Sequence, residues 1–351
     1  YYPSYLWSDN KRIPLKNNPP VGGHARFAKD ADTSNPGNYS QFKGQDYAPD
    51  RIAAQALRFI EKNKDRPFFV YVPHPMVHVP LYVSDKYKGN SKAGLFGDLM
   101  MEVDWSVGQI LETLRKHKLD KNTLVIFYSD NGTHRKLTSQ TNRGPVVGGK
   151  GRTTDAGTHV PVIVRWPGRI QPGSNDNLVD STDFLPTIME TTQRPIPARA
   201  KLDGISFYPQ LLGQPAQTRP WVFCHYDPSP GWDKDQFRKI RFARDTRFKL
   251  YGYGELYEVP NDKLEKRPIS KDTPESSAAR QRLAAVLQAQ PTPAPAQRAG
   301  AGGSRGRRLS RLYRRALPVR PPRGVRTSPG RLRCARGNPQ RPRSTPPLLY
   351  I

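Results

Sequence analysis

The stretch that decides the fold of this chain is residues 123–168, TLVIFYSDNGTHRKLTSQTNRGPVVGGKGRTTDAGTHVPVIVRWPG. The apolar run from Leu124 to Tyr128 is bounded by polar residues, which is typical of a strand buried on both faces of a parallel sheet. Asp130 and Asn131 follow this strand directly. Ligands of open α/β sheets bind beyond the carboxyl ends of strands, so we expect both side chains to face a site. Their hard oxygen atoms suit Ca²⁺ or Mg²⁺.

A second signal lies in the glycine-rich segment Gly148-Gly149-Lys150-Gly151. Glycines allow the backbone to approach an anion closely, and Lys150 would bring a positive charge to it. Each signal is weak alone, because Asp-Asn-Gly is also a common turn and a lysine in a glycine-rich loop is often simply solvated. The glycine-rich segment nevertheless favours a site over a plain turn at Asp130 and Asn131.

Four blocks of this chain, in matching order and spacing, resemble the sulfatase family, specifically its arylsulfatase branch. The blocks are RPFFVYVPHPMVHVPL, LFGDLMMEVDWSVGQILETL, LVIFYSDNG and GGKGRTTDAGTHVPVIVRWPGRI. The resemblance extends from about Tyr1 to about Ile269. It implies the alkaline-phosphatase-like α/β fold, in which a doubly wound, mostly parallel sheet is joined to a smaller C-terminal antiparallel β-sheet subdomain.

The remaining periodicity fits an α/β arrangement. Apolar residues at helical spacing predict helices over 52–60, capped by Asp50, over 95–114 and over 182–191. Apolar runs predict further strands over 68–72 and 162–166. Glu102 and Asp104 lie within the second helix, and we expect them on its solvated face rather than in a site.

The pattern of predicted elements changes from Lys201 onward, where short strand candidates replace alternating helices and strands. They cover residues 221–226, 239–243, 248–251 and 255–259, and such a run favours an antiparallel sheet. We therefore expect a partial catalytic α/β domain at 1–200, a C-terminal antiparallel β subdomain at 201–279, and a tail at 280–351.

The tail differs sharply in composition. From Arg280 onward it holds 17 of the 57 Lys and Arg residues and none of the 30 Asp and Glu residues. Such a Pro, Arg, Ala and Gly-rich segment is expected to be disordered, or to be translated from a shifted reading frame. Since the other residues are only modestly basic, we do not expect nucleic acid as a partner except non-specifically through this tail.

The resemblance assigns roles to particular residues. It implies that Asp130 and Asn131 bind one divalent cation, most often Ca²⁺ in this family, and that Lys150 binds the sulfate group. His78 occupies the place of a histidine that contacts the sulfate ester. From the residues alone, His74 and His78 would be surface-loop residues. His159 would face the substrate pocket, although this position is often Arg in the family.

The sulfatase nucleophile is a formylglycine made from the Cys or Ser of a Cys/Ser-x-Pro-x-Arg motif. Neither Cys224 nor Cys334 lies in this motif, and Ser328-Pro329-Gly330-Arg331 lacks its spacing. The early Asp-Asp metal ligands of the family are missing as well. We therefore expect that the N-terminal part of the enzyme is absent from this chain and that the chain as written is inactive.

The function that this resemblance implies is hydrolysis of sulfate esters, with a sulfated small molecule or glycan as substrate. The alternatives are a phosphodiesterase or phosphonate hydrolase of the same fold, or a non-catalytic anion-binding fragment. No apolar run approaches the length of a membrane span. Family habit predicts export to the periplasm or the cell exterior, and the two cysteines predict no disulfide framework.

Overall fold

A computed structural model describes residues 4–16, 46–78, 81–141, 144–227, 239–290 and 348–350. Residues 1–289 and 344–351 form one compact unit, and residues 290–343 form a second. The strands and helices below belong to the first unit. Most of the tail after Gln290, including Cys334 and the segment 328–331, lies outside the described residues.

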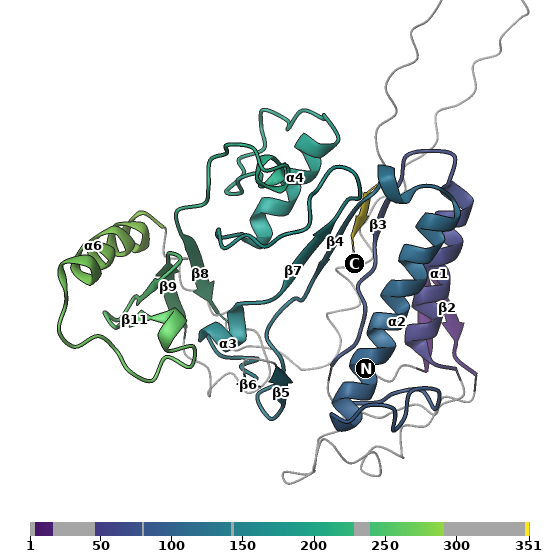
Figure 1. Ribbon diagram of the computed structural model, residues 1–351, viewed down its shortest axis with the longest axis horizontal. Coiled ribbons are helices and arrows are strands. Elements are labelled where there is room, and N and C mark those ends of the chain that lie inside the picture. Colours follow the sequence, from purple (N-terminus) through teal and green to yellow (C-terminus); the bar gives the residue numbers. More distant parts are fainter. Residues whose placement is uncertain are drawn as a thin grey trace, which may run out of the picture. The chain divides into compact units, whose positions relative to one another are not determined.

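A four-stranded sheet forms the centre of this unit (Figure 1). Its strand order is β3 (Phe69–Tyr71), β12 (Leu348–Tyr350), β4 (Leu124–Tyr128) and β7 (Val162–Arg165). β12 pairs in parallel with both β3 and β4, whereas β7 runs antiparallel to β4. The sheet is therefore mixed, and β3 and β4 point in the same direction.

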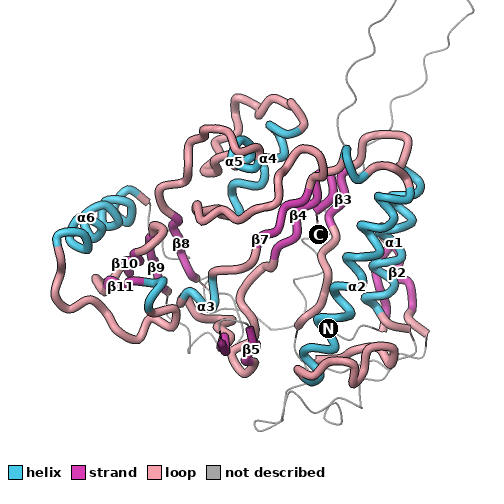
Figure 2. Tube along the Cα trace, in the orientation of Figure 1, coloured by secondary structure: helices cyan, strands magenta, loops and turns pink. Residues whose placement is uncertain are grey.

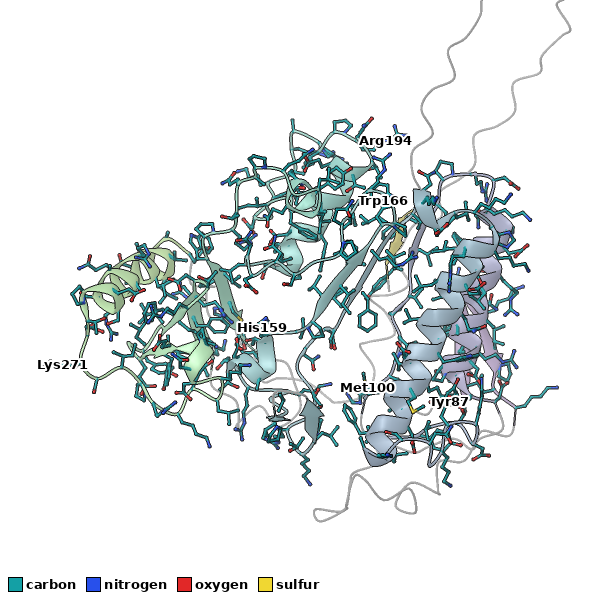
Figure 3. All side chains as sticks on the ribbon, viewed as in Figure 1. Tyr87, Met100, His159, Trp166, Arg194 and Lys271 are labelled. Atoms are coloured by element: carbon teal, nitrogen blue, oxygen red, sulfur yellow. The ribbon has the colours of Figure 1, made fainter. Side chains whose placement is uncertain are left out.

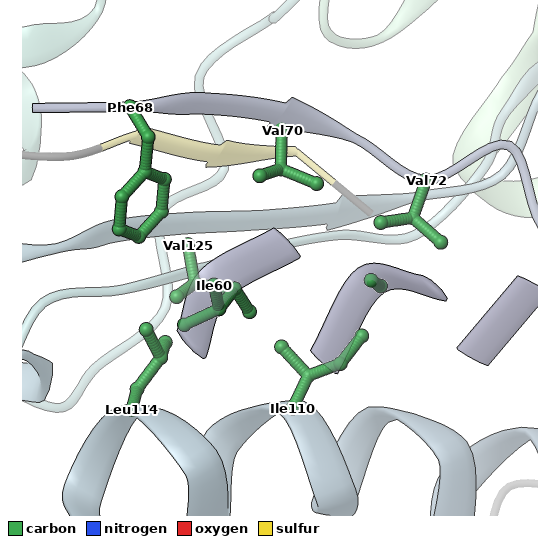
Figure 4. Close-up of a cluster of buried hydrophobic side chains, with 8 residues drawn as sticks. Ile60, Phe68, Val70, Val72, Ile110, Leu114 and Val125 are labelled. Carbon is green, nitrogen blue, oxygen red and sulfur yellow. The ribbon is translucent and has the colours of Figure 1, made fainter. Parts of the chain in front are cut away.

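Two long helices cover one face of this sheet. α1 (Ala48–Asn63) and α2 (Gly94–Lys116) direct apolar side chains toward β3 and β4. Figure 4 shows Ile60, Ile110 and Leu114 of the helices pointing toward Val70 and Val125 of the strands and toward Phe68 and Val72, which flank β3. Full burial of one such side chain contributes about 1.5–3 kcal/mol, so this cluster is a major source of stability.

The opposite face of β4 packs on a second set of elements. Leu124 and Ile126 alternate with Val125 along the strand and point away from α1 and α2, as a pleated strand requires. They meet Trp166, Phe184 and Phe207. These contacts position η3 (Ser181–Asp183), α4 (Phe184–Thr191) and α5 (Tyr208–Leu211), so helices lie on both faces of the sheet.

A second four-stranded sheet, fully antiparallel, follows in the sequence (Figure 2). Its strands are β8 (Val222–Tyr226), β9 (Ile240–Arg244), β10 (Phe248–Tyr251) and β11 (Leu256–Glu258), in sequential order. η5 (Val259–Asn261) follows the last strand. α6 (Pro274–Ala289) packs against this sheet through Ala279 and Leu283. The short strands expected after Lys201 are all present.

The shorter elements are two hairpins, a 3₁₀ turn and a short helix. β1 (Tyr5–Ser8) pairs with β2 (Lys11–Pro14), and β5 (Thr138–Thr141) pairs with β6 (Gly144–Val147). η2 (Asp120–Asn122) precedes β4, and α3 (Asp155–Thr158) precedes β7. No helix in the part of the chain that the structure describes is both long and apolar enough to cross a bilayer.

Three sequence-based expectations need correction. α6 continues to Ala289 with Leu283 buried, so ordered structure extends past Arg280. α1 begins at Ala48 rather than at a cap formed by Asp50, because Pro49 suits the first turn of a helix. Glu102 is buried rather than solvated, and it accepts hydrogen bonds from the Tyr47 hydroxyl and the Ser84 amide, each at 3.2 Å.

Candidate functional site

The candidate site lies at the edge of the central sheet where β3 and β4 end. Both strands run parallel to β12, so the loops that follow them leave from the same edge. The loop after β3 carries His78, and the loop after β4 carries Asp130 and Asn131. The topology thus brings the two predicted loops to one edge of the sheet.

Asp130 and Asn131 form a tight turn after β4. The Ser129 hydroxyl donates a hydrogen bond to the Asn131 carbonyl at 2.9 Å, which fixes the turn. The side-chain amide of Asn131 donates to Oδ2 of Asp130. This places the carboxylate and the amide side by side, with Asp130 exposed to solvent.

Glycines hold this turn against the glycine-rich segment. The Gly132 amide donates to the Gly157 carbonyl at 3.0 Å. A Cβ atom on Gly132 would lie 2.0 Å from the Ala156 carbonyl oxygen, and one on Gly149 would lie 2.5 Å from the Ala156 carbonyl carbon. Side chains are therefore excluded at both positions, and the two backbones pack directly on each other.

Lys150 is brought beside the turn by this packing. Its backbone amide donates to the Thr133 carbonyl at 2.9 Å. Partial burial lowers the pKa of the Lys150 ammonium, while the negative charge of Asp130 acts in the opposite direction. The structure thus brings Lys150 within electrostatic range of Asp130, although the two lie twenty positions apart in sequence.

A histidine that the sequence analysis did not select lies nearby. Burial lowers the pKa of His134, and the positive charges of Arg135, Lys150 and Lys136 lower it further. The His134 carbonyl oxygen would also lie 2.3 Å from a Cβ atom on Gly148, so the backbone of His134 packs directly against the glycine-rich segment. Burial and the neighbouring positive charges therefore favour the neutral form of the His134 imidazole.

His78 is half-buried in the loop after β3. In the same loop, the Met76 amide donates to Nδ1 of His74 at 3.3 Å, and burial lowers the pKa of His74. A cis peptide joins Met76 to Val77. The loop of His78 and the loop of Asp130 leave the same edge of the sheet, and Lys150 packs beside the loop of Asp130. This shared edge relates His78 to the other two residues.

A divalent cation fits the chemistry of Asp130 and Asn131 but needs more ligands than they supply. One carboxylate and one amide oxygen are hard donors, and Ca²⁺ takes six to eight oxygen ligands. Among the described residues, no group of three or more His, Cys, Asp or Glu side chains is arranged to hold a metal ion. Asp130 and Asn131 by themselves would leave most of a Ca²⁺ coordination shell unfilled.

A buried polar network lies behind the glycine-rich segment. Glu265 accepts hydrogen bonds from the Asp155 amide at 2.8 Å and from the Lys249 ammonium at 2.9 Å, and it also accepts from the Tyr251 hydroxyl. Lys249 further donates to the Thr153 carbonyl. This network joins the segment that follows Lys150 to β10, and sequence reasoning missed it because its members lie far apart in the chain.

His159 ends α3, where Figure 3 labels it. Its Nδ1 lies 3.1 Å from Oδ2 of Asp155, and its side chain is 66% exposed. Burial acts to raise the pKa of Asp155, but His159 and Arg244 outweigh burial and hold that pKa below its ordinary value. The described contacts of His159 thus support the loop that follows Lys150.

The one cysteine in the described part of the chain has a structural setting. Cys224 is a free thiol in β8, and burial raises its pKa. A raised pKa disfavours the reactive thiolate.

Comparison with known proteins identifies the family. The model of the Sulfatase family matches residues 5–193, and the model of the C-terminal region of N-sulphoglucosamine sulphohydrolase matches residues 151–290. The chain belongs to the sulfatase family, whose members hydrolyse sulfate esters. The resemblance read from the four sequence blocks is thus confirmed, and it extends beyond Ile269.

Individual relatives agree with this family. The chain is 29% identical over 264 residues to an N-acetylgalactosamine-6-O-sulfatase of Bacteroides thetaiotaomicron, covering 68% of this chain and 50% of that protein. It is 34% identical over 194 residues to human arylsulfatase A, covering 54% of this chain and 36% of that protein. The chain therefore spans half or less of the length of these two relatives.

Solved structures show the same fold. A sulfatase structure from work on glycosaminoglycan metabolism by Bacteroides thetaiotaomicron matches with a TM-score of 0.55 and 25% identity, covering 68% of this chain and 53% of that chain. A Pseudoalteromonas sulfatase matches with a TM-score of 0.55 and 22% identity, covering 72% of this chain and 52% of that chain. These neighbours support the mixed α/β, alkaline-phosphatase-like fold.

Proposed function

We propose that this chain carries the sulfate-binding part of a sulfate ester hydrolase, centred on Lys150, Asp130 and Asn131. The observation that carries the proposal is the backbone packing of Gly132 and Gly149 against Ala156 and Gly157. This packing brings a half-buried ammonium within electrostatic range of the Asp130 carboxylate, which follows the buried strand β4. The doubly wound order of the complete sheet is part of the same proposal.

Lys150 binds the sulfuryl group in this proposal. Hydrolysis of a sulfate ester moves negative charge onto the sulfuryl oxygens and the leaving oxygen, and a preorganised cation stabilises that charge. Partial burial makes the ammonium costly without a counter-ion, which is why its pKa is lowered. A bound sulfate supplies that counter-ion, so binding raises the pKa of Lys150.

His78 interacts with the ester oxygen in this proposal. Its loop leaves β3 at the edge of the sheet where Asp130 leaves β4. An imidazole titrates near neutral pH and can donate a hydrogen bond to a leaving oxygen. Its replacement is expected to weaken recognition of an ester more than recognition of inorganic sulfate, because the latter has no leaving group.

Asp130 and Asn131 would contribute two oxygen ligands to a Ca²⁺ ion. Bound there, the ion would supply positive charge for the sulfuryl oxygens. Because these two residues complete only part of a coordination shell, we assign to them only the binding and positioning of the ion.

The chain contains no Cys/Ser-x-Pro-x-Arg motif. We propose that hydrolysis by this family member proceeds through a formylglycine that residues 1–351 do not supply. No turnover of an aryl sulfate is therefore expected from residues 1–351 alone. Measurable turnover of 4-nitrophenyl sulfate that depends on calcium would contradict this part of the proposal.

We propose a sulfated glycan as the substrate class. The Bacteroides relative, an N-acetylgalactosamine-6-O-sulfatase, matches over more of this chain than human arylsulfatase A does. This supports a 6-sulfated N-acetylgalactosamine unit as the first compound to test. Export to the periplasm or the cell exterior follows the habit of the family and stays a prediction.

The experiment is a calorimetric titration of the full chain with inorganic sulfate. Lys150→Met is expected to lower the sulfate affinity by about tenfold or more, since a partly buried charge-assisted contact contributes more than 1.4 kcal/mol. Lys201→Met, which removes an exposed lysine, serves as the charge-matched control. Equal affinities for the wild type and Lys150→Met would refute the proposed site.

A further inference from the structure

An open pocket of about 360 Å³ begins at Gly151, the residue that follows Lys150. Its walls come from residues 151–154, from Glu265 and from the C-terminal antiparallel sheet, which contributes four tyrosines. A cavity of this size holds a small ligand. None of the residues proposed above to bind sulfate or metal lines it.

One wall of the pocket is a supported aromatic surface. Tyr253 is 61% exposed and stacks on Tyr251, with ring centroids 5.0 Å apart and an interplanar angle of 16°. Tyr251 is buried and meets Tyr257 edge to face at 5.8 Å. Its hydroxyl donates to Glu265 of the buried network. The Tyr253 ring is therefore backed by a rigid layer rather than by solvent.

The remaining wall is polar and carries charges of both signs, because Arg152 and Glu265 both line it. The Glu265 carboxylate is paired with the buried Lys249 ammonium at 2.9 Å, whereas Arg152 adds a positive charge. The Tyr226 hydroxyl donates to the Gly151 carbonyl at 3.1 Å, which ties β8 to the segment that follows Lys150. Arg152 lines the pocket and is exposed, and its guanidinium has no hydrogen bond or ion pair among the described residues. The pocket thus combines an aromatic face with a cation that an anionic ligand would pair with.

Sugar rings match this combination. The C–H groups on one face of a pyranose are slightly positive and pack on the negative face of an aromatic ring. The hydroxyl groups at the ring edge require polar partners, and a uronate carboxylate or a second sulfate would pair with Arg152. A purely apolar ligand would leave Arg152 and the backbone groups of the loop without partners.

We propose that this pocket binds a sugar ring of an anionic oligosaccharide, next to the sulfated unit held at Lys150. The inference rests on the proposed function for the position of the sulfate. Tyr253 stacks on the neighbouring ring, and Arg152 pairs with an acidic group on it. The pocket therefore selects chains of sugars over a single sulfated monosaccharide or an aryl sulfate.

The test is calorimetric titration of the full chain with a chondroitin 6-sulfate tetrasaccharide, which alternates 6-sulfated N-acetylgalactosamine with a uronic acid. Tyr253→Ala is expected to weaken tetrasaccharide binding about tenfold, the effect of one lost stacking contact. Tyr253→Phe keeps the ring and is expected to bind within about twofold of the wild type. Neither variant is expected to change the affinity for inorganic sulfate, because Tyr253 lies outside the proposed sulfate site.

Arg152→Met is compared with Arg199→Met, which removes an exposed arginine that does not line the pocket. Only the Arg152 variant is expected to weaken tetrasaccharide binding. Since Tyr253 and Arg152 are both exposed, thermal melts are expected to show folded variants.

The outcomes separate this inference from the proposed function. Unchanged tetrasaccharide affinity in Tyr253→Ala, or equal losses in Tyr253→Ala and Tyr253→Phe, would overturn the sugar pocket even if Lys150→Met abolishes sulfate binding. Absence of tetrasaccharide binding by the wild type would also overturn it. A tetrasaccharide affinity that depends on Tyr253 but not on Lys150 would support the pocket and refute the proposed sulfate site. If 4-nitrophenyl sulfate competes with the tetrasaccharide and Tyr253→Ala removes this competition, the pocket binds aryl groups and the proposal is overturned.

Discussion

Replacing Gly132 by Ala tests whether the packing of two loops creates the candidate site. The added Cβ would lie 2.0 Å from the Ala156 carbonyl oxygen, and contacts below 3.0 Å are essentially never observed for Cβ atoms. The two backbones must therefore separate by about 1 Å, since a close-packed interior leaves no room for the extra carbon. The hydrogen bond from the Gly132 amide to the Gly157 carbonyl would lengthen or break.

The expected cost follows from these two effects. Overpacking of this kind costs about 1–3 kcal/mol. Loss of the hydrogen bond adds about 1 kcal/mol. Gly132→Ala should therefore lower the free energy of unfolding by about 2–4 kcal/mol. Because Lys150 and Asp130 sit on the two loops that separate, sulfate affinity should fall as well.

Gly108→Ala is the matched control. Gly108 lies within α2, and a Cβ there meets nothing within 4 Å. In a helix interior, alanine is more favourable than glycine by about 0.5–1 kcal/mol, so this variant should be stabilised. Urea denaturation followed by circular dichroism measures both variants. If Gly132→Ala is as stable as the wild type, or if the two variants shift in the same direction, the packing argument is wrong.

Three further predictions concern the surroundings of the site. Lys249→Met leaves Glu265 buried without its ammonium partner and should lower the free energy of unfolding by about 3–5 kcal/mol. The double variant Lys249→Met/Glu265→Gln should regain much of this loss. If urea denaturation shows that the losses of the two single variants simply add in the double variant, the two side chains are not coupled. Burial lowers the folded-state pKa of His74 below 6.5, so the unfolded state takes up the proton first and stability should fall as pH drops through about 6.5; His74→Phe should flatten this dependence, and identical slopes would show that His74 does not cause it. Millimolar Ca²⁺ should raise the melting temperature of the wild type but not of Asp130→Asn, and equal shifts would place calcium elsewhere.

The central elements were predictable because local patterns determine them. The apolar run from Leu124 to Tyr128 coincides with β4, and the helical stripe over 95–114 lies within α2. The spacing of the apolar residues in both segments predicts which of their faces are buried. The position of Asp130 and Asn131 beyond β4 followed from the same reasoning.

The buried charges were not predictable from local patterns. Lys249 lies in the middle of β10 and is fully buried because Glu265, from a loop after β11, supplies its counter-charge. Glu102 is buried because Tyr47 and Ser84, both distant in sequence, hydrogen-bond to it. A local rule places a charged side chain at the surface, and only tertiary partners reverse that rule.

The boundary of the tail was misplaced for a related reason. The composition changes at Arg280, but α6 continues to Ala289 because Ala279 and Leu283 pack on the antiparallel sheet. A few apolar side chains on one face are enough to dock a helix whose sequence is otherwise polar. Composition therefore marked the change in character but not the end of the structure.

The most direct test of sulfate binding by Lys150 is the pKa of its ammonium group, measured by NMR of the side-chain nuclei of isotope-labelled lysine with and without saturating sulfate. We predict a pKa of Lys150 below 10.5 in the free chain, caused by partial burial, and a clear rise when sulfate binds. Lys150→Met identifies the resonance by its disappearance. A Lys150 pKa that is at its ordinary value, or that sulfate leaves unchanged, would contradict the claim that this lysine is the sulfate-binding cation.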